Sequence, residues 1–394
     1  MIHKTNEISN GVKKNYKIIS IKAREILDSR GSWTVEVDLL TSQGLFRDSA
    51  PSGASTGKYE APVVSAKKAV ENINKIIALK LKGKEVTDQQ GIDNFLNPEK
   101  FGANTTTAIS MAVCRAGAAA QNIPLYKYIA CIADRGPTSN KTKLIEAGPL
   151  TAFNMINGGA HASNQLDFQE FMAVCSTQKA SEIYQDLRNK LGKNVGDEGG
   201  FTPNFKDPEE ALKLLSGYNV KIVIDVAASQ FFKNGNYKIR NRVFSGEKLL
   251  NYYLSLIKKY PILALEDPFD EDDFESWKKI SNFQFPISNF LIIGDDLLVT
   301  NPERIKMAEE KKLCNGLLLK INQIGTVTKA LQAAKLARSF NWKIMVSHRS
   351  GETNDDFIAD FAVGIGADFI KTGAPARGER VSKYNRLLRI TEEL

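Results

Sequence analysis

The stretch 221-KIVID-225 is a short run of apolar, mostly β-branched residues that ends in an aspartate. Five similar runs follow it, each separated from the next by an amphipathic segment of helical length: 262-ILALED-267, 291-LIIGDD-296, 316-GLLLK-320, 343-KIMVSH-348 and 368-DFIKTG-373. Short apolar strands that alternate with helices are typical of βα units and a parallel sheet. The six runs therefore predict an α/β fold with a parallel sheet at its centre.

Two earlier apolar runs, at residues 153–156 and 170–174, raise the number of expected strands to eight. Only eleven residues separate Asn157 from Gln169, which is too few for a helical crossover between parallel strands. We therefore expect this first pair to be antiparallel. Two helices are expected before the regular units, at 176–191 and 207–216. The pattern as a whole predicts a modified eight-stranded barrel of the TIM type.

The first third of the chain has a different order of predicted strands and helices. Residues 17–46 contain short β-type runs bounded by turn residues, which predicts an antiparallel meander. Helical patterns follow at about 65–80 and 105–133, and residues 136–140 are polar and rich in helix breakers. Strands followed by helices indicate an α+β unit. We expect an N-terminal α+β capping domain over residues 1–140 and a barrel domain over residues 141–394.

The composition is that of an ordinary globular protein, with 42% hydrophobic and 25% charged residues in 394. No apolar stretch approaches the roughly 18 residues of a membrane span, and the first twenty residues lack the pattern of a secretory signal. We expect a cytoplasmic protein. The net charge of +8 comes from lysines interleaved with acidic residues, which is typical of solvated helix faces. Nucleic acid is therefore not an expected partner.

A titratable side chain stands at or next to the carboxyl end of every one of the six regular strands. Active sites of such barrels lie at this rim, so these side chains are expected to converge on one pocket. A single aspartate after a strand can simply cap the following helix, but six in register disfavour that explanation. The six residues are Asp225, Glu266, Asp295, Lys320, His348 and Lys371.

Three of these residues, Asp225, Glu266 and Asp295, are carboxylates on neighbouring strands. Carboxylates that face one point repel one another unless a cation lies between them, and a ligand set made of oxygen favours magnesium. Lys320 and Lys371 are expected close to that charge. A neighbouring cation and partial burial both lower the pKa of a lysine, so one of the two lysines can act as a base. The rim therefore predicts metal-assisted proton abstraction.

Further segments outside the strands complete a recognisable set of motifs. They include 24-REILDSRG-31, 52-SGASTGKYE-60, 154-NMINGGAHA-162, 169-QEFM-172, 194-NVGDEGGF-201, 318-LLKINQIGT-326 and 346-VSHRSGET-353. Together with the strand ends, these segments resemble the enolase family over nearly the whole chain. The resemblance implies a lyase that dehydrates 2-phospho-D-glycerate reversibly to phosphoenolpyruvate in glycolysis, with two Mg²⁺ per active site, the second arriving with the substrate.

The resemblance also implies a role for each motif residue. Lys320 is expected to take the proton from C2, and Glu198 is expected to help the hydroxide leave C3, with Glu170 nearby. An acid in that role needs a raised pKa, which burial beside other carboxylates can provide. His161 is similar to a histidine on a loop that closes over the substrate. The metal ligands implied are Asp225, Glu266 and Asp295 for the first ion and Ser55 for the second.

The implied substrate contacts extend around the rim. Arg349 and Ser350 match phosphate-binding positions, where the fork of a guanidinium suits a phosphate dianion. Lys371 is expected to pair with the substrate carboxylate. The full set implied by the resemblance is His161, Gln169, Glu170, Glu266, Asp295, Lys320, His348, Arg349, Ser350 and Lys371.

The resemblance further implies a homodimer in which Glu36 and Arg389 pair across the interface. Two alternatives remain open from the sequence. A related enzyme could remove an α-proton without loss of water, although such relatives lack the Gly-Asp-Glu-Gly-Gly and Ser-His-Arg-Ser segments present here. The chain could instead have a non-catalytic or secondary binding role on an enolase scaffold, although it retains every residue proposed for the chemistry.

Overall fold

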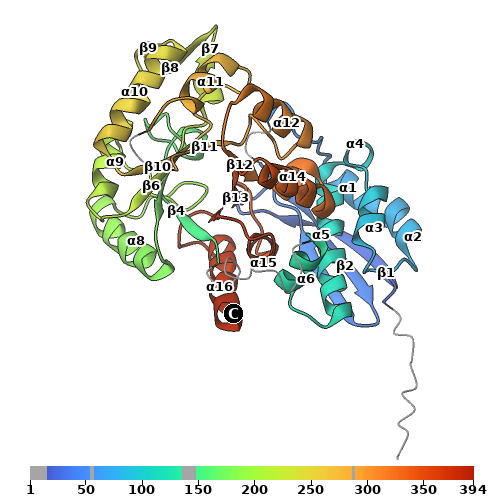
Figure 1. The fold of residues 1–394 in the computed structure, drawn as a ribbon. Coiled ribbons are helices and arrows are strands. Elements are labelled where there is room, and N and C mark those ends of the chain that lie inside the picture. The colour runs from blue at the N-terminus through green and yellow to red at the C-terminus, as the bar shows by residue number, and fades with distance from the viewer. Residues whose placement is uncertain (1–15, 54–56, 135–147, 286–288) are drawn as a thin grey trace, which may run out of the picture.

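A computed structural model of the chain describes residues 16–53, 57–134, 148–285 and 289–394. Figure 1 shows an N-terminal unit, coloured blue to cyan, packed beside a larger unit that runs from green to red. The predicted boundary at residue 140 lies outside the described residues, so the exact division of the chain stays a prediction.

The N-terminal unit is the predicted meander followed by helices. Its three antiparallel strands are β1 (Ser20–Leu27), β2 (Trp33–Thr41) and β3 (Gly44–Ser49). Alternate residues of β2 are buried, and they form one core with residues of the helices that follow. The helices are α1 (Ala66–Asn72), α2 (Ala78–Leu81), α3 (Gln89–Phe95), α4 (Pro98–Phe101), α5 (Ala103–Gln121) and α6 (Leu125–Ile132). A π-helical segment, Ile73–Ile77, joins α1 to α2.

The larger unit is a closed barrel whose strands follow the order β10-β11-β12-β13-β14-β4-β5-β6. Strand β5 is antiparallel to both β4 and β6, whereas β4 is parallel to β14. The predicted antiparallel first pair is therefore confirmed, and β5 alone runs against the other barrel strands described. The strands are β4 (Leu150–Asn157), β5 (Glu170–Val174), β6 (Lys221–Asp225), β10 (Ile262–Glu266), β11 (Leu291–Gly294), β12 (Gly316–Leu319), β13 (Lys343–Ser347) and β14 (Phe369–Lys371).

The interior of the barrel is filled by side chains from every strand. This layer consists of Ala152, Met172, Val223, Ala264, Leu291, Ile293, Leu318, Met345 and Phe369. Residues on either side of these point outward, because side chains alternate along a strand, and they pack against the surrounding helices; Ile222 and Ile224 are examples. The barrel is thus a packed core below the site rather than a pore.

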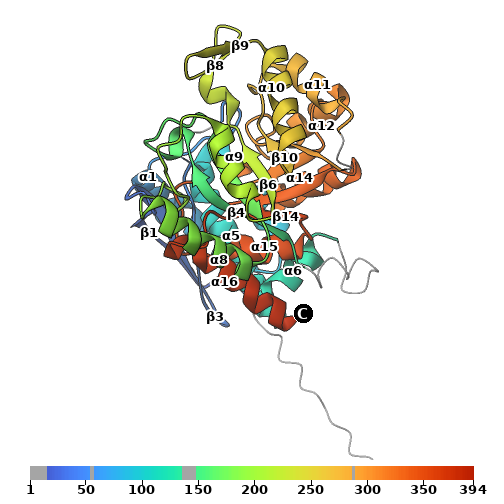
Figure 2. The same cartoon turned by 90° about the vertical axis from the view of Figure 1, so that its left-hand side faces the viewer.

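Helices surround the strands, and Figure 2 shows α8 and α9 on the side of β4 and β6. They are α8 (Thr177–Leu191), α9 (Pro208–Ser216), α10 (Gly246–Lys259), α11 (Phe274–Ser281), α12 (Pro302–Lys311), α13 (Ile321–Ile324), α14 (Val327–Ser339), α15 (Phe357–Gly364) and α16 (Gly378–Glu393). The two helices predicted at 176–191 and 207–216 are α8 and α9. A small sheet of β7 (Phe232–Lys233), β8 (Asn236–Ile239) and β9 (Arg242–Phe244) was not predicted, because strands this short leave no periodic signal.

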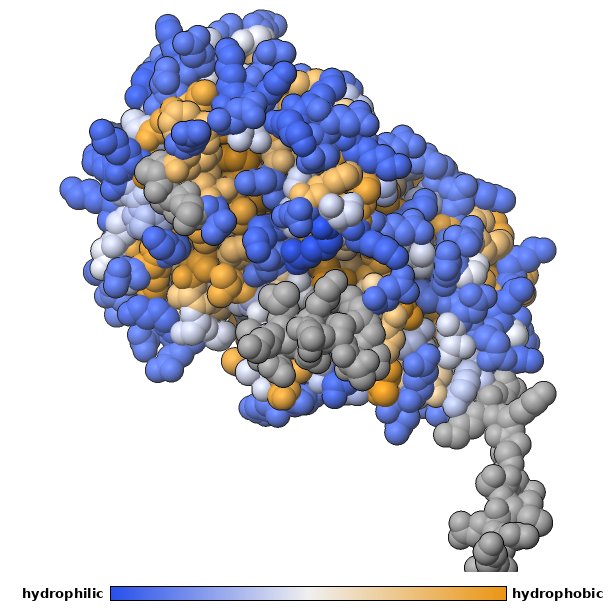
Figure 3. Space-filling model, viewed as in Figure 1, coloured by the Kyte–Doolittle hydropathy of each residue, from blue (hydrophilic) through white to orange (hydrophobic). Residues whose placement is uncertain are grey.

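On the face seen in Figure 3, hydrophilic side chains line the outer edge of the barrel and apolar side chains gather inside that edge. None of the helices in the described part of the chain combines the length and the apolar character needed to cross a bilayer.

Candidate active site at the carboxyl rim of the barrel

The alternation of side chains along the strands explains how the rim residues come together. Asp225 stands two residues after the interior Val223, and Lys371 stands two residues after Phe369, so both point along the bore. Strand β5 reaches the same rim with its first residue, because it runs in the opposite direction. Its register pairs Glu170 with Asp225. Because β5 is antiparallel, its beginning rather than its end lies at the site.

Lys371 lies among three carboxylates. Its Nζ donates to Glu170 Oε1 at 3.2 Å, to Asp225 Oδ2 at 3.2 Å and to Glu266 Oε1 at 2.7 Å, and all four side chains are buried. Burial lowers the pKa of Lys371, but these carboxylates outweigh burial and raise it well above its usual range. Burial also raises the pKa values of Glu170 and Glu266, reinforced by their acidic neighbours. Lys371 is thus a permanent cation that offsets carboxylate repulsion.

Lys320 forms the second ion pair of the site. Its Nζ donates to Asp295 Oδ2 at 2.5 Å, and the amide of Gln323 donates to Asp295 Oδ1 at 2.8 Å. Burial lowers the pKa of Lys320, but Asp295 outweighs burial, so that pKa is raised. The lowered lysine pKa expected from the sequence assumed a metal cation beside the amine, and without that cation the pKa of Lys320 has the opposite direction. The physical reason is that Asp295, rather than a cation, is the nearest charged neighbour.

A strained turn holds the backbone of Lys320. Val299 and Thr300 both have positive φ angles, 43° and 55°, which are unfavourable for β-branched residues. The turn directs Thr300 Oγ1 towards Lys320, whose backbone N–H donates to it at 3.0 Å. The same hydroxyl donates to Gln323 Oε1 at 2.8 Å. Backbone strain of this kind often accompanies functional sites, where the surrounding contacts sustain it.

A glutamate between two histidines lies on the other side of the cavity. Glu198 Oε1 is 3.4 Å from His161 Nδ1 and 3.7 Å from His348 Nε2, and Asn154 donates to Glu198 Oε2 at 2.9 Å. Burial raises the pKa of Glu198, but His161, His348 and the nearby Arg380 outweigh burial and hold that pKa well below its usual range.

This direction contradicts the expected raised pKa of Glu198. The prediction considered only burial and neighbouring carboxylates, whereas the basic groups that act on Glu198 are two imidazoles and a guanidinium. In the protein by itself the raised pKa belongs to Glu170 and the lowered one to Glu198. Within the pair, Glu170 is therefore the group that binds a proton more readily.

Arg349 connects the barrel to the N-terminal unit. Its guanidinium donates to both oxygens of Glu60, at 2.9 and 3.2 Å, and burial of the pair is nearly complete. Ser52 and Gly351 exchange backbone hydrogen bonds beside this pair, at 2.7 and 2.9 Å. The loop after β3 is thereby fastened to the barrel rim. Ser55, the predicted ligand of a second metal, lies in the same loop but outside the described residues.

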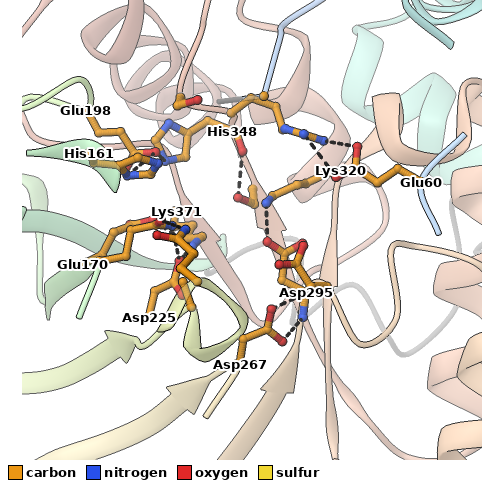
Figure 4. Close-up of a pocket in the computed structure, with 18 residues that line it drawn as sticks. Glu60, His161, Glu170, Glu198, Asp225, Asp267, Asp295, Lys320, His348 and Lys371 are labelled. Atoms are coloured by element: carbon orange, nitrogen blue, oxygen red, sulfur yellow. Dashed lines mark hydrogen bonds and ion pairs between the residues drawn. The ribbon is translucent and has the colours of Figure 1, made fainter. Parts of the chain in front are cut away.

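One cavity gathers nearly all of the predicted site residues, and Figure 4 shows them in two groups, with Glu198 and Lys371 opposite Lys320 and Asp295. The predicted residues on its wall are His161, Gln169, Glu170, Glu198, Asp225, Asp295, Lys320, His348, Arg349, Ser350 and Lys371. Glu266 lies behind this wall, fully buried, and reaches the cavity through its contact with Lys371.

Five further polar residues line the cavity that the sequence did not single out: Glu60, Gln230, Asp267, Asp296 and Ser347. Glu60 ends the segment 52-SGASTGKYE-60, which resembles the enolase family, so this motif could have identified it. Asp267 accepts from the backbone N–H groups of Asp295 and Asp296 at 2.8 and 2.7 Å, and so shapes their turn. Burial and Asp295 raise the pKa of Asp296 to about 7.

The donor set of the cavity suits a divalent cation. Seven carboxylates line it against three side chains of Lys and Arg, so ionisation of most carboxylates leaves an excess of negative charge. Buried oxygens of Glu170 and Glu266 have no hydrogen-bond partner among the described residues. Ligand atoms lie within 4.8 Å of one another in two groups of described residues, Asp267–Asp295–Asp296 and His161–Glu170–Glu198, and neither group is the predicted trio. Hard oxygen ligands favour Mg²⁺ or Ca²⁺ over softer metals.

Two protein-family models match the chain. The model described as enolase, N-terminal domain matches residues 18–129, and the model described as enolase, C-terminal TIM barrel domain matches residues 146–394. The barrel model alone covers more than half of the chain, and the closed eight-stranded barrel agrees with its description. The general character of the family, a metal-dependent lyase, agrees with the acidic cavity. The chain therefore belongs to the enolase family.

Proposed function

We propose that the chain catalyses the reversible, magnesium-dependent dehydration of 2-phospho-D-glycerate to phosphoenolpyruvate. One observation carries the proposal: Lys320 lies on one side of a single cavity and the Glu170–Glu198 pair on the other (Figure 4). Dehydration needs both groups, because a proton leaves one carbon and hydroxide leaves the next. General acid and base groups on the two sides of a substrate serve such an elimination.

Lys320 is the proposed base for the C2 proton. Its amine can accept a proton only after the ammonium has lost one, and Asp295 opposes that loss by raising the pKa. Neutralising the charge of Asp295 therefore favours the base form of Lys320. The proton for the departing hydroxide is proposed to come from the Glu170–Glu198 pair, in which the pKa of Glu170 is raised well above its usual range. His161 and Gln169 would orient the substrate from the same side of the cavity.

Asp225, Glu266 and Asp295 are the residues that we propose for the first Mg²⁺, and Ser55 for a second that arrives with the substrate. A bound Mg²⁺ would supply positive charge that offsets the negative charge developing on the substrate carboxylate. Lys371 would add its permanent charge for the same carboxylate. Arg349, Ser350 and His348 would hold the phosphate end, with the guanidinium of Arg349 shared between Glu60 and the ligand.

A homodimer remains part of the proposal, with Glu36 and Arg389 at its interface. Arg389 is exposed on α16, and Glu36 is already paired with Arg24 in its own chain, so the pair across subunits would share the Glu36 carboxylate. Sedimentation of an Arg389→Glu variant tests this, because an unaltered dimer would remove the pair from any important role. The cytoplasmic location expected from the sequence also stays a prediction.

The direct test follows the ultraviolet absorbance of the enol product when 2-phosphoglycerate is added with Mg²⁺. Wild type should produce a rise that a metal chelator abolishes, and Lys320→Ala should produce none. Lys335→Ala serves as the control. Lys335 is an exposed lysine that pairs with Asp134 and does not line the cavity. Equal rates for wild type and Lys320→Ala would remove the base from the proposal. A folded wild type without activity would instead favour the non-catalytic binding role.

A further inference from the structure

Arg380 is a fully buried arginine near the start of α16, and it donates to three backbone carbonyl oxygens beside the site. One terminal nitrogen donates to the carbonyl oxygen of Arg349 at 2.6 Å. The other donates to the carbonyl oxygens of Ser350 at 2.6 Å and Asp197 at 3.0 Å. Room for the side chain depends on Gly373, because a Cβ at that position would lie 2.8 Å from Arg380 Cδ. The fold thus reserves space for a buried guanidinium beside the site.

The same guanidinium determines which nitrogen of His348 carries its proton. Arg380 Nη1 lies 2.7 Å from His348 Nδ1. A guanidinium has donors only, so Nδ1 must accept this hydrogen bond and must be unprotonated. The other ring nitrogen, Nε2, then holds the proton. A proton on Nδ1 would set two N–H groups against each other at hydrogen-bond distance.

The protonated Nε2 faces the cavity and has no hydrogen-bond partner among the described residues, although it is buried. Its nearest acidic neighbour, Glu198 Oε1, is 3.7 Å away, beyond normal hydrogen-bond distance. A buried donor without a partner costs free energy, which an acceptor atom of a ligand can recover. The N–H of His348 therefore points to an acceptor that the ligand brings.

We propose that Arg380 is a positioning residue that holds His348 as the neutral Nε2–H tautomer, so that the imidazole offers a fixed hydrogen-bond donor to an anionic oxygen of the substrate. In this arrangement His348 donates a hydrogen bond but does not supply the proton for the departing hydroxide. The identity of the ligand rests on the proposed function, whereas the tautomer does not.

The electrostatics of the pocket support the neutral form. Burial lowers the pKa of His348 well below its usual range, and Arg380, Lys371 and Lys320 act in the same direction, against Glu198. A neutral imidazole that points its N–H towards Glu198 still favours the ionised carboxylate, though less than a cation would.

The experiment is nitrogen-detected NMR of the full-length protein with ¹⁵N-labelled histidine, recorded without substrate at neutral pH. The chain has three histidines, so a His348→Gln variant assigns the signals of His348 by their loss. In wild type we expect an unprotonated Nδ1 and a protonated Nε2. In Arg380→Met, which removes the donors but keeps an unbranched side chain, we expect the Nδ1–H tautomer or the imidazolium to appear. Arg380→Lys, which restores a cationic donor, should recover part of the wild-type signal.

Arg386→Met is the matched control, because Arg386 lies on the same helix but donates to Asp360, at 2.7 Å through each of two nitrogens. It should leave the His348 signals unchanged even if it lowers stability. A proton on Nδ1 in wild type, or an imidazolium, overturns the proposal whether or not Arg380→Met folds. An unchanged tautomer in folded Arg380→Met overturns it as well. Because no turnover is measured, these outcomes are independent of whether the chain dehydrates 2-phosphoglycerate.

Discussion

Replacing Lys371 by methionine removes a buried cation that three carboxylates share while keeping most of the side-chain volume. Contacts of 2.7 to 3.2 Å join its Nζ to Glu170, Asp225 and Glu266. Breaking a buried ion pair by removing one partner costs about 3–5 kcal/mol, because the other charge stays buried without compensation. The cost should not reach three times this value, because Glu170 and Glu266 have raised pKa values and can take up protons instead.

We therefore expect Lys371→Met to lower the free energy of unfolding by about 3–5 kcal/mol at pH 7. The loss should shrink as the pH is lowered towards 5, because protonation of the carboxyls removes the charges that Lys371 neutralised. Urea unfolding followed by circular dichroism measures both effects, with Lys335→Met as the control for losing an exposed lysine. A loss no larger than that of the control at pH 7, or a loss that grows at low pH, would show that Lys371 does not stabilise the three carboxylates.

Two further predictions concern regions away from the site. Arg47 holds the pKa of Asp38 at about 2, below its usual value, so the stability that this contact contributes is present above pH 4 and is lost as the pH falls to 2. The urea midpoints of wild type and Asp38→Asn should therefore converge across that range, and a constant gap would contradict the assignment. Gly364→Ala would bring a Cβ to 2.7 Å from Ile129 between α15 and α6, which should cost about 1–3 kcal/mol in urea unfolding. Gly217→Ala, where the nearest atom is 3.3 Å away, should cost clearly less, and equal costs would show that the close approach is unimportant.

The barrel and its rim could be predicted because both depend on a local repeat. A period of two along each strand sets Val223 inside and Asp225 at the rim, and the same step leads to Glu266, Asp295, Lys320 and Lys371 on four other strands. On β13 this step leads from Met345 to Ser347, and His348 follows one residue later. The short connection after Asn157 was enough to predict the antiparallel pair. Because β5 is antiparallel to its neighbours, its first residue, Glu170, lies at the rim.

The protonation states could not be predicted, because they depend on which groups meet across long stretches of sequence. Lys320 has a raised pKa owing to Asp295, 25 residues earlier, and Glu198 a lowered one owing to groups that include His348. The spacing of these residues along the sequence does not indicate either contact. Arg380 was missed for the same reason, since an arginine in an amphipathic helix reads as a surface residue until its burial is known.

In the proposed reaction Lys320 removes the C2 proton, and the Glu198 side of the cavity serves the later loss of hydroxide. Deuterium incorporation at C2 of 2-phosphoglycerate in D₂O with Mg²⁺, followed by proton NMR, separates these steps. We expect Lys320→Ala to lose the exchange, whereas Glu198→Gln should keep the exchange but form little phosphoenolpyruvate. Exchange at the wild-type rate in folded Lys320→Ala would show that Lys320 is not the base.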